Sequence, residues 1–133
     1  MIYYILAYPM SSKKNTTRSL RVLHKRRQES LKLLLRPEPI IIGNVYDVMR
    51  RCGNSSCHCA AKPGHRQTLL IYAEKGRRRC KFVRRQDAEW IKQAWLRYRD
   101  CKKALRELRA LNSRELALLR VQLRWRDVRG NAV

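Results

Sequence analysis

Residues 50–65 read RRCGNSSCHCAAKPGH, and this stretch decides how the chain is interpreted. Three cysteines and two histidines lie within the fourteen positions from 52 to 65. Zinc binds four sulfur or nitrogen ligands tetrahedrally, and closed sites with three cysteines and one histidine are structural. The simplest set of ligands is Cys52, Cys57, Cys59 and His65. The stretch therefore predicts a zinc knuckle over residues 52–65, with a structural Zn2+ ion as its cofactor.

The spacing within the knuckle does not determine which residue is the fourth ligand. Gly53 and Asn54 suit a tight backbone turn after the first ligand. Either His58 or Cys80 could replace His65 as the fourth ligand. A set of incidental thiols is the alternative reading, but free cysteines are normally buried. The three cysteines here stand in a polar segment rich in Gly, Ser and Asn, which favours metal binding.

The same stretch lacks the groups that catalysis would need. A catalytic zinc keeps one position open and works with a general base, but no acidic residue lies between Asp47 and Glu74. The Glu of the zinc deaminase signature is absent. The chain also has no Gly-rich phosphate-binding loop and no carboxylate pair suited to two-metal chemistry. We therefore expect a protein that is not an enzyme and has no catalytic residues.

Residues on both sides of the knuckle predict a small antiparallel sheet. The run 40–49 favours a strand, with Gly43-Asn44 as a bulge or turn near its start. Two further strands are expected at 68–72 and 79–83, joined by a hairpin turn at 74–77. We expect about three strands within residues 40–85.

Helical patterns flank the predicted sheet. Thr16 or Thr17 can cap a helix over 16–35, which Pro37 ends. Residues at heptad-like intervals predict a second, long helix over 87–123. Its expected buried seam is Ile91, Ala94, Tyr98, Cys101, Leu105, Leu108, Asn112, Leu116, Leu119 and Leu123. The fold class is therefore α+β: a zinc-stabilised sheet flanked by an N-terminal helix and a long C-terminal helix, in a single domain over 1–133.

One segment of the long helix allows two readings. Asn112-Ser113-Arg114-Glu115 resembles a capping box, which would start a new helix. In a continuous helix, by contrast, a buried Asn112 would fix the register. The continuous helix is favoured, because Ala, Leu, Arg and Glu on both sides are strong helix formers.

The charge of the chain points to a polyanionic partner. Lys and Arg number 32 against 10 acidic residues, a net charge of +22 over 133 residues. Self-repulsion at this charge opposes compaction, and nucleic acid relieves it when phosphates are neutralised. A hydrophobic content of 44% indicates that the chain folds. We expect DNA or RNA as the partner rather than a membrane, which would require a broad lipid-facing stripe.

The opening of the chain is apolar but short. Residues 1–8 are followed by Pro9, far short of the roughly 20 residues that span a bilayer. The segment lacks the basic front and the cleavage site of a signal peptide. We therefore expect a cytoplasmic protein, in which cysteines serve as metal ligands or buried thiols rather than disulfides.

The basic residues expected to contact phosphates cluster on the first helix, before the first zinc ligand, and along the hairpin. They are Lys25, Arg26, Arg27, Arg50, Arg51, Arg77, Arg78, Arg79, Lys81, Arg84 and Arg85. For any single one of them a solvated surface residue is the better reading, and it is their clustering near a rigid knuckle that favours binding. Trp90, Trp95, Trp125 and Tyr98 could stack on bases, although helical spacing beside leucines favours core packing for Trp95 and Tyr98.

Several of these segments together resemble a known family. They are Gly43-Asn44, Arg51-Cys52-Gly53, Cys57-His58-Cys59, Gly64-His65, Leu70-Ile71-Tyr72, Gly76-Arg77 and Phe82-Val83. Over about residues 40–123 the pattern resembles an uncharacterised bacterial and phage domain family catalogued as a domain of unknown function. The resemblance implies the same metal ligands, a strand hairpin before a long helix, and an association with mobile genetic elements. After His65, Arg66-Gln67-Thr68 stands where that family has Gly-Pro-Tyr.

Two functions follow from the sequence. The leading hypothesis is a nucleic-acid-binding accessory protein in which zinc holds the hairpin rigid. The alternative is a protein–protein adaptor whose long helix pairs with a helical partner or with a second copy of the chain. The leucines that would make this contact are Leu105, Leu108, Leu116 and Leu119.

Overall fold

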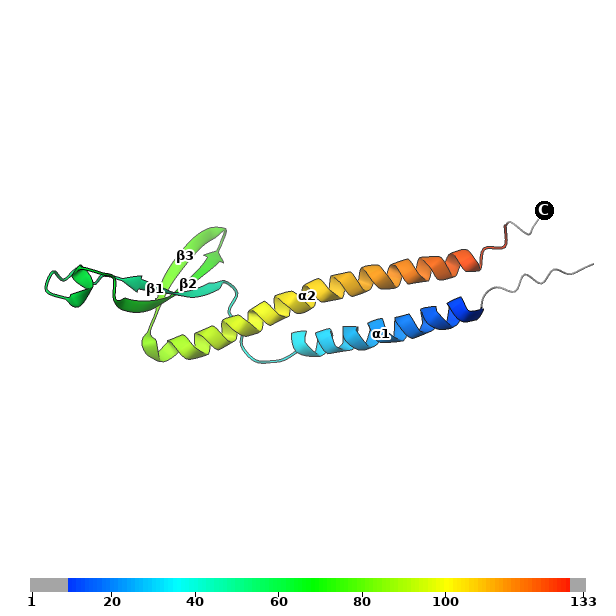
Figure 1. Cartoon of the computed structure of the whole chain (residues 1–133), viewed down its shortest axis with the longest axis horizontal. Helices are drawn as coiled ribbons and strands as arrows, with labels where there is room; N and C mark the ends of the chain where they lie inside the picture. The colour runs from blue at the N-terminus through cyan, green and yellow to red at the C-terminus, as the bar shows by residue number, and fades with distance from the viewer. Residues whose placement is uncertain (1–9, 130–133) are drawn as a thin grey trace, which may run out of the picture. The chain divides into compact units, whose positions relative to one another are not determined.

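A computed structural model of the chain describes residues 10–129, so the apolar segment 1–8 lies outside the described residues. Its elements are α1 (Met10–Leu34), β1 (Asn44–Arg50), the short 3-10 helix η1 (His58–Ala60), β2 (His65–Glu74), β3 (Arg77–Val83) and α2 (Arg85–Trp125), shown in Figure 1. The α+β class, with one helix on each side of a three-stranded antiparallel sheet in the sequence, is confirmed. No helix among the described residues is long and apolar enough to span a membrane.

The chain forms two compact units, whereas the sequence analysis treats residues 1–133 as one domain. One unit contains α1 and the part of α2 from Lys103 onward, and the other extends from Pro37 to Lys102. The helix α2 is continuous through Asn112 and Glu115, as predicted, so these residues do not start a new helix. The helical unit and the sheet unit are described separately below.

In the helical unit, α1 packs along the second part of α2 (Figure 1). Among residues 15–34 of α1, whose side chains are described, the buried ones are Thr16, Leu23 and Ser30, which recur every seven positions on one side of the helix. Since α1 begins at Met10, Thr16 lies inside the helix rather than capping it at the expected start. The helix ends just before Pro37, whose ring is incompatible with a further turn.

The buried side of α2 in this unit differs from the predicted seam. Ala104 and Leu111 are buried, whereas most of the predicted leucines are exposed. The exposed ones are Leu105, Leu116, Leu119 and Leu123. The buried stripe thus lies one position before the predicted one, because small side chains such as Ala104 and Ser30 let two helices approach closely. The predicted burial of Asn112 is also wrong, since its exposed amide oxygen accepts a hydrogen bond from Arg27.

In the sheet unit, the strand order is β1-β2-β3 and both pairs are antiparallel. The loop before β1 is fixed to the first part of α2. The backbone N–H of Ile41 donates to the Ala94 carbonyl (3.2 Å), and the indole N–H of Trp95 donates to the Gly43 carbonyl (3.0 Å). A Cβ atom at position 43 would lie 2.5 Å from the Ile71 carbonyl oxygen. Only glycine therefore allows the chain to enter β1 here, and the strand begins at position 44 rather than 40.

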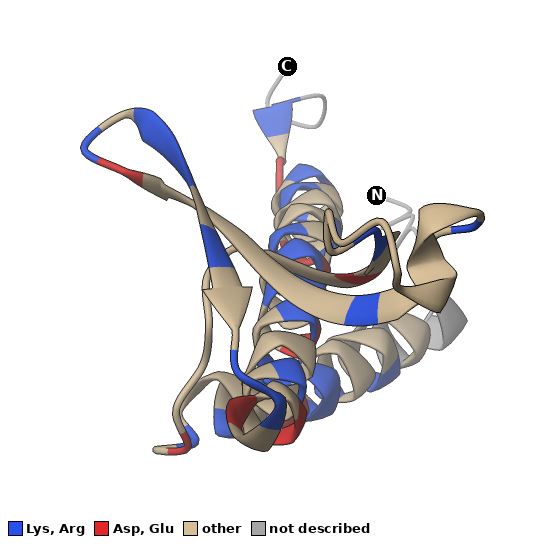
Figure 2. Cartoon of the chain, turned by 90° about the vertical axis from the view of Figure 1, so that its left-hand side faces the viewer, with Lys and Arg blue, Asp and Glu red and all other residues tan. Residues whose placement is uncertain are grey.

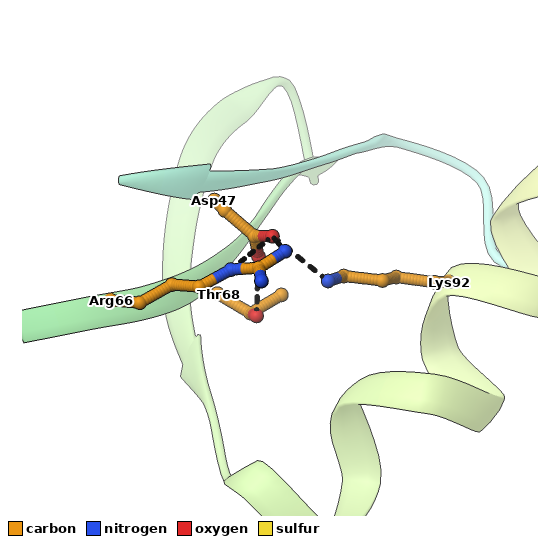
Figure 3. A network of polar contacts seen from close by, with 4 residues as sticks. All are labelled: Asp47, Arg66, Thr68 and Lys92. Atoms are coloured by element: carbon orange, nitrogen blue, oxygen red, sulfur yellow. Dashed lines mark hydrogen bonds and ion pairs between the residues drawn. The ribbon is translucent and has the colours of Figure 1, made fainter. Parts of the chain in front are cut away.

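A carboxylate joins the sheet to α2 in this unit (Figure 3). Asp47 on β1 accepts hydrogen bonds from the Thr68 hydroxyl (2.7 Å), the Lys92 ammonium (2.9 Å) and the Arg66 guanidinium (2.8 Å to Nε). These contacts, that of Thr68 first, hold the pKa of Asp47 well below its usual range. Because Lys92 belongs to α2, the ionised carboxylate fixes that helix against one face of the sheet.

The buried leucine of the helical unit offers a test of the corrected seam. Leu111 is 2% exposed and Leu105 is 56% exposed. We expect Leu111→Ala to lower the free energy of unfolding by about 2–5 kcal/mol, because it leaves a cavity between the helices. The matched change Leu105→Ala should cost no more than about 0.5 kcal/mol. Urea unfolding of both variants measures the difference, and equal losses would contradict the observed seam.

The Asp47 contacts predict a pH dependence of stability. The folded-state pKa is depressed, so the stabilisation is complete above the ordinary aspartate pKa of about 3.9 and is lost as the pH falls below it. We expect Asp47→Asn to lower the melting temperature at neutral pH. Below pH about 4, the melting temperature of the variant should fall less with decreasing pH than that of the wild-type chain. Asp100→Asn changes an exposed carboxylate of α2 and serves as the control. Acid also affects the knuckle, but that effect is the same in both variants. Identical acid profiles for the two variants would refute the role of Asp47.

Candidate metal centre and nucleic-acid interface

The pairing of β1 with β2 brings the two ends of the knuckle together. Arg50, the last residue of β1, lies opposite His65, the first residue of β2. Cys52 follows two positions after Arg50, so the first and last predicted ligands enter the site from adjacent strands. The intervening loop then has to supply only the two remaining ligands.

A tight turn directs the chain from Cys52 to Cys57. Gly53 has a φ of 85°, in the left-handed region that favours glycine. The Asn54 side chain accepts hydrogen bonds from the backbone N–H of Ser56 (3.0 Å) and from its hydroxyl (2.7 Å). The Asn54 carbonyl accepts a third from the N–H of Cys57 (3.2 Å). The turn expected at Gly53 and Asn54 is therefore present.

The 3-10 helix η1 places Cys59 at the centre of the knuckle. It begins after Cys57, whose carbonyl accepts a hydrogen bond from the N–H of Ala60 (2.9 Å). Cys59 is fully buried, and its sulfur accepts a hydrogen bond from the backbone N–H of Cys52 (3.2 Å). The helical turn explains how two cysteines one residue apart can both face the same point.

The four predicted ligands converge. The Sγ atoms of Cys52, Cys57 and Cys59 and a ring nitrogen of His65 all lie within 4.8 Å of one another. The sulfur atoms of Cys52 and Cys59 are 3.4 Å apart, and Cys57 Sγ is 3.2 Å from His65 Nε2. Ligands bound tetrahedrally to zinc at 2.0–2.3 Å lie roughly 3.3–3.8 Å from each other. The donor atoms and their separations fit a metal ion, and three thiolates with one imidazole are consistent with zinc.

Of the two alternative ligands, the structure places Cys80 outside the cluster and His58 beside it. Cys80 lies on β3 opposite Ile71 and is exposed, and it does not belong to the converging group. His58 lies nearer, with its Nδ1 atom 3.6 Å from the sulfur of Cys57 and its ring centroid 5.2 Å from that of His65. The group whose ligand atoms converge contains His65.

The thiols of the cluster differ in acidity. The backbone N–H of Asn54 and then the thiol of Cys59 hold the pKa of Cys52 below its ordinary value. The N–H of Cys52 acts on Cys59 in the same direction, but burial and the neighbouring thiols outweigh it and raise the pKa of Cys59. Several thiolates in one small site repel one another, and a divalent cation would remove that repulsion.

Most of the predicted phosphate-binding residues of the sheet unit lie along β3 and at its ends (Figure 2), while Arg50 and Arg51 lie at the end of β1. Arg79 pairs with Glu74, and Arg84 pairs with Asp87. Others make no ion pair with any part of the chain whose side chains are described. They are Arg50, Arg51, Arg77, Arg78, Lys81 and Arg85. The hairpin thus carries a surplus of cationic groups without carboxylate partners.

The basic cluster on α1 has a different environment. Arg26 forms an ion pair with Glu107 (2.6 Å), and Arg27 pairs with Glu115 and donates to Asn112. Both arginines therefore contribute to the packing of the helical unit, while Lys25 is exposed. Sequence spacing gave no sign of these pairs, because their partners are more than eighty residues away along the chain.

Two aromatic residues of the sheet were missed as candidate binding residues. Tyr46 and Phe82 are both exposed, and the Arg50 guanidinium lies 5.0 Å from the centroid of the Phe82 ring. The alternation of side chains along β1 was the available signal. It places Tyr46 on the face opposite to Val45, which is buried.

Comparison with known sequences and structures assigns the chain to a family. No protein with a curated description and no solved structure gives a significant match. The sequence profile of one family, described as a domain of unknown function (DUF6788), matches residues 18–93, more than half of the chain. The match begins in α1 and ends in the first part of α2, so it includes the knuckle and the whole sheet. The chain therefore belongs to the DUF6788 family of domains of unknown function.

Proposed function

We propose that the chain is a non-enzymatic nucleic-acid-binding accessory protein in which a structural zinc ion holds a basic hairpin in place. The observation that carries this proposal is the unneutralised charge of β3. No acidic residue lies between Glu74 and Asp87. In the described part of the chain, Arg77, Arg78 and Lys81 of this segment make no ion pair. A phosphate backbone would supply the missing anions and would release its condensed counterions on binding.

The knuckle supports a structural rather than a catalytic role for the metal. Its four ligands would fill a tetrahedral coordination sphere, and a closed sphere leaves no position for a substrate or a reactive water. The ligands come from the end of β1, the loop and the start of β2, so a bound ion would join the two strands. Metal-binding free energy would then contribute directly to folding of the sheet unit. Because β2 also forms the hairpin with β3, a bound ion would hold that hairpin in place as well.

The first prediction of the proposal is one zinc ion per chain. We expect a Cys57→Ala/Cys59→Ala double variant to lose the metal, because two of four thiolate and imidazole ligands are removed. Cys80→Ala should retain full zinc, since this thiol lies outside the cluster. His65→Ala should lose most of the zinc and His58→Ala should retain it. Elemental analysis of purified proteins measures this, and undiminished zinc in the double variant would rule out the site.

The second prediction concerns the salt dependence of binding. The full chain should bind duplex DNA or structured RNA with an affinity that falls steeply as salt is added. We expect the triple variant Arg77→Gln/Arg78→Gln/Lys81→Gln to bind more weakly. Its slope of log affinity against log salt should be shallower by about 0.9 for each phosphate that the variant no longer neutralises.

A matched triple variant on α2 serves as the control for total charge. Lys103→Gln/Arg106→Gln/Arg109→Gln removes the same number of cations from exposed positions. If both variants lose affinity and slope equally, binding reflects net charge alone and the hairpin has no special role. Absence of salt-sensitive binding by the wild-type chain would defeat the proposed function.

A protein–protein adaptor is the second candidate, and one observation favours it. Four leucines of α2 are exposed in the helical unit: Leu105, Leu116, Leu119 and Leu123. An exposed apolar stripe of this kind suits pairing with a helical partner or with a second copy of the chain. Such pairing would depend on apolar contact, and therefore far less on salt than contact with phosphates does. The salt series described above separates the two functions.

A further inference from the structure

One face of the sheet is not covered by the first part of α2, up to Lys102, which belongs to the same unit. Residues directly opposite each other on antiparallel strands point to the same face. The register places Tyr46 opposite Leu69 and Leu69 opposite Phe82, so the three form a row across all three strands. Asp47, one position further along β1, points to the other face, where it binds Lys92 of α2. The row is therefore on the side of the sheet away from that helix.

The aromatic rings of this row are accessible. Tyr46 is 42% exposed and Phe82 is 50% exposed, while Leu69 between them is half-buried. The Arg50 guanidinium lies over the Phe82 ring, with its central carbon 5.0 Å from the ring centroid. This is a cation–π arrangement on the open face. Large apolar side chains gathered on an exposed surface indicate an interaction site.

The charge of this face identifies the kind of partner. The three strands contain two acidic residues, Asp47 and Glu74, and alternation places both on the face that is turned toward Lys92. The open face holds Arg50 and Arg78 by the same alternation and has no carboxylate. A surface with flat rings, positive charge and no negative charge is complementary to a molecule with flat aromatic groups on an anionic chain.

We propose that the open face formed by Tyr46, Leu69, Phe82 and Arg50 binds single-stranded nucleic acid by stacking bases on its two rings. The inference rests on the proposed function, and it specifies that the nucleic acid is single-stranded and which surface of the sheet binds it. In a duplex the faces of the bases are covered by neighbouring bases, whereas a single strand exposes them to aromatic side chains. Two inter-strand spacings separate Tyr46 from Phe82 by roughly 10 Å, which lets each ring take a separate base of one strand.

A lipid surface suits this face less well. Insertion among acyl chains requires a broad and continuous apolar stripe. On this face, alternation places Asn44, Arg50 and Gln67 among the apolar residues, so polar groups interrupt any such stripe. Stacking on isolated rings with polar surroundings is the arrangement found on single-strand-binding surfaces.

The test uses the full zinc-loaded chain and a short labelled single strand of thymidines, measured by fluorescence anisotropy. Tyr46→Ala and Phe82→Ala should each weaken binding by about 5- to 150-fold, the loss expected for a stacking ring. Affinity for a duplex should remain unchanged. The wild-type chain should bind a strand of abasic residues, with the same phosphates but no bases, at least as weakly as either variant binds thymidines. Leu96→Ala removes an apolar side chain that is 42% exposed on α2 and should leave both affinities unchanged.

Several controls and outcomes separate this inference from the proposed function. Phe82→Leu keeps an apolar side chain and should still lose affinity, and zinc content with melting temperature verifies that each variant folds. If the variants bind single strands as tightly as the wild type, with normal salt sensitivity, the stacking face is refuted and the proposed function stands. If the wild-type chain binds no nucleic acid, both fail. Binding to phosphatidylserine vesicles that depends on Tyr46 and Phe82, without binding to thymidines, would also overturn the inference in favour of a membrane.

Discussion

The antiparallel register between β1 and β2 is the constraint on which the rest of the sheet unit depends. It places Arg50 opposite His65, so the first and last ligands of the knuckle meet, and it places Asp47 opposite Thr68. Because side chains alternate along a strand, a shift by one residue would turn every side chain to the other face. One register therefore closes the metal cluster, directs Asp47 toward Lys92 and leaves Tyr46 on the open side.

The second constraint is the charge of the chain, which the fold neutralises only in part. Asp47 pairs with Arg66 and Lys92, and Glu115 pairs with Arg27. Each of these carboxylates supports packing within its own unit. With 10 acidic residues against 32 basic ones, most of the positive charge has no internal partner. Part of the surplus lies on the hairpin, at Arg77, Arg78 and Lys81, and a polyanion bound there would reduce the self-repulsion that opposes folding.

The sequence predicted those features that depend on residue type and local spacing. The four ligands of the cluster, the three strands and the continuous long helix follow from cysteines in a polar loop, turn residues and helix formers. The buried side of α2 could not be predicted, because leucines occupy two adjacent helical stripes and only packing against α1 selects the one with Ala104. The roles of Arg27 and Asp47 were equally hidden, since both depend on partners brought close by tertiary structure. Pairing register, which local pattern leaves undetermined, also decides that Tyr46 and Phe82 share a face.

The two proposed kinds of contact with nucleic acid differ in their physical origin, and they divide the work of recognition. Contacts from Arg77, Arg78 and Lys81 to phosphates draw their free energy from counterion release, so they weaken as salt rises. Stacking on Tyr46 and Phe82 buries apolar surface and depends little on ionic strength. The hairpin would then govern how quickly and how broadly nucleic acids are captured, whereas the open face would select strands with accessible bases. Both surfaces belong to a sheet whose first two strands meet at the knuckle, so a metal bound there would hold the selective and the non-selective contacts in one rigid unit.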